Sequence, residues 1–101
     1  MTKYEQVIAE ERRLRILQLL VRVRGHATET EIYGTLDNLR VDPRLTEDIV
    51  RADLRFLDRE GLIVMERVDS GLFAATITKL GKQVEAGKVE IEGVKLPDFG
   101  A

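Results

Sequence analysis

The stretch from residue 45 to residue 77 constrains the fold of this chain more than any other part of its sequence. It opens LTEDIVRADLRFLDREGLI and closes VMERVDSGLFAATI. Val50, Leu54 and Leu57 recur at helical spacing and Gly61 follows them, which is typical of an amphipathic helix that ends at a glycine. Two strand-like runs then flank a short loop that ends in glycine, which indicates a β-hairpin. The sequence therefore predicts a helix over residues 46–61 and strands over residues 62–68 and 72–77.

The residues before this stretch predict two more helices. A helix over residues 4–24 carries an apolar arc that is wider than a one-sided surface helix needs. The arc consists of Leu14, Ile16, Leu17, Leu20, Val21 and Val23. Two interpretations stay open: the helix lies centrally in a small core, or its second face packs on another subunit. Gly25 ends this helix, and a second helix runs from residue 28 or 30 to residue 40, ahead of Pro43.

The residues after the hairpin predict one short helix and a tail. Thr78 can cap a helix that runs to Ala86 and ends at Gly87. Beyond it, residues 88–101 contain glycine, proline and several apolar side chains, which indicates an extended C-terminal arm. A length of 101 residues fits one domain, here residues 1–87, followed by this arm.

Helix, helix, helix, hairpin, helix is the order of a winged helix-turn-helix domain. The expected fold is therefore α+β and mostly helical, with three helices, a two-stranded hairpin wing, a short C-terminal helix and an extended tail. The segment IVRADLRFLDREGLI resembles the recognition-helix segment of DeoR-type and ArsR-type winged-helix repressors, where two leucines and a Gly-Leu pair lead into the wing. Here these residues are Leu54, Leu57, Gly61 and Leu62.

Two further segments extend the resemblance. ATITKLGKQVEAG resembles the final strand and helix that are common in such regulators. Over nearly its whole length, including the closing GVKLPDFG, the chain is similar to a family of small winged-helix proteins from Mu-like phages and prophages. This resemblance implies a fold and a genomic context more than an activity.

The resemblance to repressors implies double-stranded DNA as a partner, with the third helix in the major groove. The expected DNA-binding residues are Thr46, Arg51 and Arg55 as main contacts, Arg59 as a phosphate contact and Arg67 beside the wing. Glu47 and Asp48 oppose this role because they would meet phosphate, although acids in the first turn also stabilise a helix N-terminus. The wing tip, Asp69-Ser70-Gly71, lacks the lysine or arginine that a DNA-contacting wing often carries.

A second hypothesis comes from a different class: a protein–protein interaction module that keeps the winged fold and has lost DNA binding. Its partner would be a phage or host protein, bound by the acidic face or the C-terminal arm. The net charge of -2 gives no support for nucleic acid, since isolated DNA-binding domains are typically basic. A continuous positive stripe through Arg51 and Arg55 would favour DNA, whereas a patchwork or negative face would favour protein.

A homodimer is expected, formed by helix one, the tail, or both. The candidate interface residues are Ile16, Leu20, Val23, Val94, Leu96 and Phe99. The basic run of helix one, which includes Arg12 and Arg13, is interpreted as a solvated face, with phosphate binding as the alternative.

Several kinds of site have no support in the sequence. There is no cysteine and only one histidine, His26, so a metal site is not expected. No nucleophile, phosphate-loop or dinucleotide motif appears, and we expect neither an enzyme nor a cofactor. No apolar run approaches membrane-spanning length and no signal-peptide core precedes the helices, which predicts a cytoplasmic protein.

Overall fold

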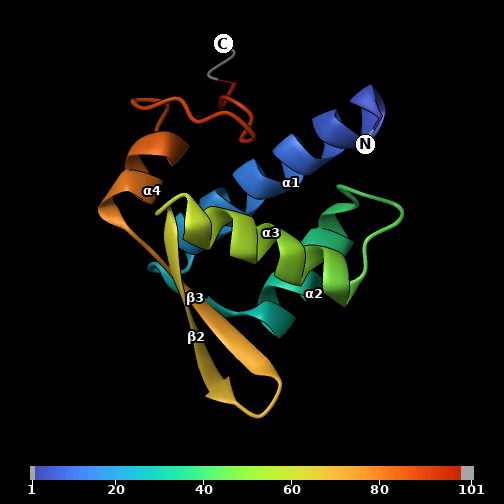
Figure 1. The fold of residues 1–101 in the computed structure, drawn as a ribbon, viewed down its shortest axis with the longest axis vertical. Coiled ribbons are helices and arrows are strands. Elements are labelled where there is room, and N and C mark those ends of the chain that lie inside the picture. Colours follow the sequence, from blue (N-terminus) through green and yellow to red (C-terminus); the bar gives the residue numbers. More distant parts are fainter. Residues whose placement is uncertain (1, 99–101) are drawn as a thin grey trace.

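Four helices and a three-stranded antiparallel sheet make up residues 2–98, the part of the chain that this computed structural model describes (Figure 1). The result is an α+β fold that is about half helical. In chain order the elements are α1 (Lys3–Arg22), β1 (His26–Thr28), α2 (Glu29–Leu39), α3 (Glu47–Arg59), β2 (Ile63–Asp69), β3 (Leu72–Ile77) and α4 (Lys79–Glu85). None of the helices in this part of the chain is both long and apolar enough to cross a membrane.

A threonine precedes each helix and fixes where it begins. The hydroxyl oxygens of Thr2, Thr28, Thr46 and Thr78 each accept a hydrogen bond from the backbone N–H three residues further on. These bonds satisfy a donor that the first helical turn leaves free. The predicted helices are confirmed, with ends that differ by one or two residues.

The sheet contains one strand that the sequence did not predict. His26 opens β1, and β1 pairs with β3 in the strand order β1-β3-β2. Ala27 lies opposite Ala75, and both are buried. A strand of three residues is too short to show periodicity in the sequence, so pairing with β3 in the folded chain makes these residues a strand. The predicted hairpin of β2 and β3 is confirmed.

Helix α1 runs through the middle of the core. Ile16, Leu17 and Leu20 are completely buried, and they cluster with buried leucines of α2 and α3 and with buried residues of the sheet. The chain itself therefore covers most of the apolar arc of α1, whereas Val21 and Val23 near its end are 42% and 40% exposed. The prediction that Ile16 and Leu20 contact a second subunit is wrong, because a central helix presents no free apolar face at these positions.

The tail up to residue 95 lies against the body of the protein. The Lys95 N–H donates to the carbonyl oxygen of Glu10 (3.2 Å), and an Arg13 guanidinium N–H donates to the carbonyl oxygen of Gly93 (3.0 Å). Val94 is buried in the core cluster. Gly93 has a φ of 96°, and a Cβ there would lie 2.5 Å from the Phe56 ring, so only glycine fits this close approach.

Candidate functional site

The outer face of α3 carries most of the residues that were predicted to bind DNA. Thr46 is exposed, and its hydroxyl is engaged as the N-cap acceptor for the Ile49 N–H (3.2 Å). Glu47 and Asp48 follow in the first turn, where their charge favours the positive end of the helix. Arg55 and Arg59 lie one turn apart and are exposed. Within residues 2–98 no carboxylate lies at ion-pair distance from either arginine.

Arg51 is held by partners inside the chain. Its Nε donates to one carboxylate oxygen of Glu29 (3.0 Å), and its Nη2 donates to the other oxygen and to the carbonyl oxygen of Gly71 (2.7 Å). Glu29 is the buried first residue of α2, and it also accepts a hydrogen bond from the Phe73 N–H (3.1 Å). The hydrogen bonding between Arg51 and Glu29 lowers the pKa of Glu29 and raises the pKa of Arg51. Arg51 thus ties α3 to α2 and to the turn of the hairpin.

Arg67 also has a partner within the hairpin. The guanidinium carbons of Arg51 and Arg67 lie 4.9 and 5.5 Å from the centre of the Phe73 ring. Cations at this distance are attracted to an aromatic face. Two of the four arginines that were expected at DNA therefore have intramolecular contacts.

A hollow of about 310 Å³ separates the starts of α2 and α3 from the hairpin turn. Its charged lining is three carboxylates, from Glu29, Glu47 and Asp48, and the single guanidinium of Arg51. Since Arg51 already pairs with Glu29, the charge left in this hollow is negative. Within residues 2–98 no group of histidine and acidic side chains is arranged to hold a metal ion.

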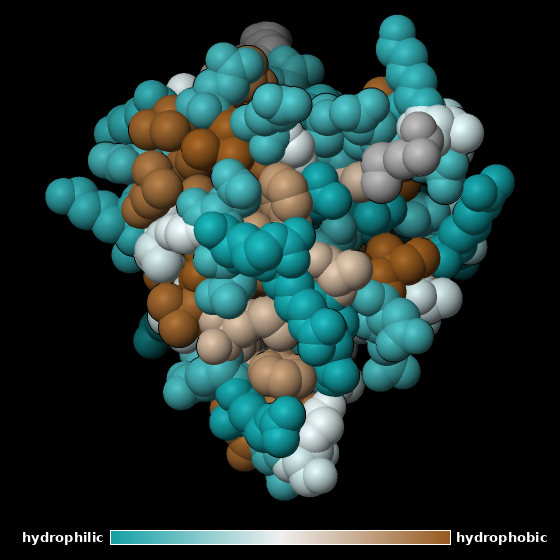
Figure 2. All heavy atoms as spheres, viewed as in Figure 1, coloured by the Kyte–Doolittle hydropathy of each residue, from teal (hydrophilic) through white to brown (hydrophobic). Residues whose placement is uncertain are grey.

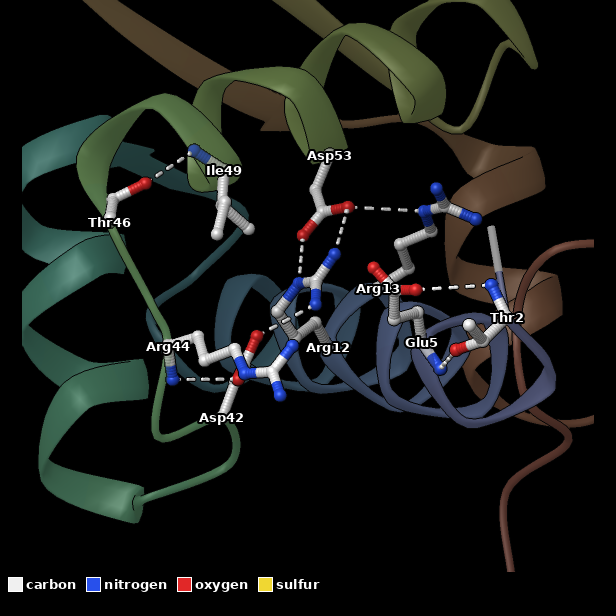
Figure 3. Close-up of polar contacts among 9 residues, drawn as sticks. All are labelled: Thr2, Glu5, Arg12, Arg13, Asp42, Arg44, Thr46, Ile49 and Asp53. Atoms are coloured by element: carbon white, nitrogen blue, oxygen red, sulfur yellow. Dashed lines mark hydrogen bonds and ion pairs between the residues drawn. The ribbon is translucent and has the colours of Figure 1, made fainter.

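A second polar cluster lies on the inner side of α3 (Figure 3). Asp53 is 1% exposed, and its carboxylate accepts hydrogen bonds from Arg12 Nε (2.6 Å) and Arg13 Nε (3.2 Å). Arg12 also donates to Asp42 (2.9 Å), and the other oxygen of Asp42 accepts from the Arg44 N–H (2.9 Å). This cluster joins α1, α3 and the linker between α2 and α3.

The arginines of this cluster are largely covered by the protein rather than solvated, with side chains 11% and 16% exposed. Burial lowers the pKa of Arg12, but its contacts with Asp53 and Asp42 outweigh that effect and raise the pKa overall. The guanidinium carbon of Arg13 lies 3.9 Å from the centre of the Phe56 ring. The interpretation of Arg12 and Arg13 as a solvated face is wrong, because both pair with Asp53 on α3, which is 41 and 40 residues further along the chain.

Sequence reasoning missed Asp53. The sequence does contain a clue, because this residue lies three positions after Val50 and four before Leu57, on the apolar stripe of α3. An acid on a buried stripe needs a partner, since an unpaired buried charge is costly. Only the fold shows which basic residues supply it.

The remaining predicted interface residues that the structure describes differ in exposure. Val23 is 40% exposed and Leu96 is 47% exposed, whereas Val94 is buried within the chain and Phe99 lies outside the described residues. The prediction for Val94 is wrong, because it packs into the core of its own chain. Figure 2 shows apolar side chains gathered in the region that α4 and the tail occupy in Figure 1.

The expected likeness to proteins of Mu-like phages is supported by one of two relatives, a protein of phage Mu. No protein-family model matches the chain, and no solved structure is significantly similar to it. The chain is 32% identical over 76 residues to an uncharacterized protein of Haemophilus influenzae, an alignment that covers 75% of this chain and 72% of that protein. It is 30% identical over 91 residues to protein gp26 of Escherichia phage Mu, which is 90% of this chain and 92% of gp26. The chain therefore belongs to the family of the phage Mu protein gp26.

Proposed function

We propose that this chain is a winged-helix module that binds another protein. The order of its elements supports the winged-helix assignment: three helices precede a hairpin, and a short helix follows it. In this assignment α3 is the recognition helix, and β2 and β3 form the wing. The function of such a domain depends on the chemistry of its surface, since one fold serves many activities.

The main support for a protein partner is that Arg51 is already ion-paired within the chain. DNA affinity depends on arginines and lysines that neutralise phosphates. Arg51 is the first arginine of the expected stripe, but Glu29 neutralises it, and Glu47 and Asp48 lie one turn before it. The outer face of α3 is thus a patchwork of both charges, which suits a protein partner better than a polyanion.

A photo-crosslinking side chain at position 55 tests this proposal in cells that carry a Mu-like phage. We expect covalent adducts that nuclease leaves intact and in which the attached partner is a polypeptide. Adducts that nuclease removes would overturn the proposal. A crosslinker at exposed Asp37 on α2 is the control, because this site lies away from the outer face of α3 and should give a different adduct pattern.

A second candidate function is DNA binding by the exposed pair Arg55 and Arg59. In that case Arg55→Ala should weaken specific binding by roughly 1–3 kcal/mol if it reads a base edge. The double change Glu47→Gln plus Asp48→Asn should strengthen non-specific binding, because two negative charges leave the path to phosphate. Fluorescence anisotropy with duplex DNA at low salt measures both effects, and binding that neither change alters would exclude this face as the DNA site.

A further inference from the structure

A groove follows the N-terminal half of α1, on the side that faces the linker between α2 and α3. One part, of about 190 Å³, has Tyr4, Ile8 and Ile49 as apolar lining. The neighbouring part, of about 430 Å³, has Ile8, Leu39 and Val41. Because Ile8 lines both parts, the apolar surface is continuous. Tyr4 and Leu39 are 63% and 53% exposed, so its two ends lie open to solvent.

The charges around this groove leave an excess of arginine. Two of its arginines are neutralised within the chain, since Arg12 pairs with Asp42 and Arg15 pairs with Glu11. Arg40 and Arg44 are exposed on the linker side of the groove, and neither has an ion-pair partner within residues 2–98.

One further acid lines the groove. Glu5 accepts a hydrogen bond from the Thr2 N–H, and this bond lowers the pKa of its carboxyl group. It also lies close enough to feel the charge of Arg44, which extends from the linker toward α1 (Figure 3). The lining that a partner would meet is therefore apolar along its length, with two unpaired positive charges along one side and one acid, Glu5, on the other.

We propose that this groove binds an acidic amphipathic helix of a partner protein. The inference rests on the proposed function, a module that binds protein, and adds a second contact surface with the chemistry of the segment that it takes. A helix that docks in a groove uses apolar side chains at spacings of three and four residues as anchors, and charges at the edge select the partner. Here the apolar contacts would come from Tyr4, Ile8, Leu39 and Val41. The selection for carboxylates would come from Arg40 and Arg44. The outer face of α3 takes no part in this contact.

Two labelled peptides of about 14 residues test the proposal. Helix formation in water is marginal at this length, so each peptide is stapled. Both carry leucines at positions i, i+4 and i+7, and the remaining positions are mostly glutamate in one peptide and mostly lysine in the other. We expect the acidic peptide to bind and the basic one not to bind. Arg40→Glu plus Arg44→Glu should weaken binding of the acidic peptide about tenfold or more, because two attractions become repulsions.

Matched variants separate the groove from overall charge. Arg55→Glu plus Arg59→Glu makes the same change in net charge on α3 and should leave peptide binding unchanged. Tyr4→Asp should also weaken binding about tenfold through loss of an exposed anchor. Val68→Asp, on an apolar side chain of the hairpin that is similarly exposed, should have no effect. All these side chains are exposed, so circular dichroism is expected to show folded protein throughout.

Three outcomes would overturn the proposal: equal binding of both peptides, binding of neither, or a dimer in sedimentation that Tyr4→Asp dissociates. The last outcome would assign the groove to a second copy of this chain. The proposed function fails separately, if nuclease-sensitive adducts form at position 55 while the acidic peptide still binds in the groove.

Discussion

Asp53→Asn is the sharpest test of what joins α1 to α3. The change keeps the shape of the side chain and removes the negative charge that Arg12 and Arg13 share. Arg12 and Arg13 side chains are 11% and 16% exposed, so water cannot take over the role of the carboxylate. Asp42 still pairs with Arg12, which leaves Arg13 without a carboxylate partner among residues 2–98.

The size of the effect follows from this geometry. Removing one partner of a buried ion pair costs about 3–5 kcal/mol, and the small exposure of both arginines places this case near 3 kcal/mol. The free energy of unfolding of a domain of this size is only about 5–15 kcal/mol in total. With about 4–8 °C per kcal/mol, the midpoint of thermal unfolding should fall by about 12–24 °C.

Urea and thermal unfolding followed by circular dichroism measure this loss. Asp42→Asn should cost less than Asp53→Asn, because Arg12 keeps its two bonds to Asp53. Asp37→Asn, on the exposed face of α2, should stay within about 0.5 kcal/mol of the wild type. A loss below about 1 kcal/mol for Asp53→Asn would refute the view that this carboxylate is the essential counter-ion.

Three further substitutions test other parts of the structure. Glu29→Gln should cost about 1.5–3 kcal/mol of unfolding free energy at pH 7 in urea melts. Because the folded pKa of Glu29 is below 4.5, its contribution to stability is present above that pH and is lost as the pH falls through the folded pKa. Stability curves of wild type and variant that stay parallel in acid would contradict this role. Leu54→Ala should cost about 2–5 kcal/mol, because Leu54 is fully buried, and a loss well under 1 kcal/mol would place it outside the core. Gly93→Ala should release the tail, seen as faster hydrogen exchange at the Lys95 N–H, and unchanged exchange there would show that Phe56 gives way.

The sequence by itself determined the local elements. Threonine caps, glycine stops and apolar periodicity depend on residues a few positions apart, so the helices and the β2–β3 hairpin are readable from the chain alone. The apolar stripe of α3, with Leu54 and Leu57, follows from the same rule. The choice between a central and a dimeric α1 stayed open, because periodicity shows how wide an apolar face is and not what covers it.

The tertiary structure decided which charges are free. Arg51 has its counter-ion 22 positions away and Arg13 has its counter-ion 40 positions away, and no local pattern connects such pairs. The same holds for β1, whose three residues become a strand only through β3. An arginine on a predicted outer face is thus only a candidate for binding, because an ion pair formed in the folded chain determines how much of its charge remains for a partner.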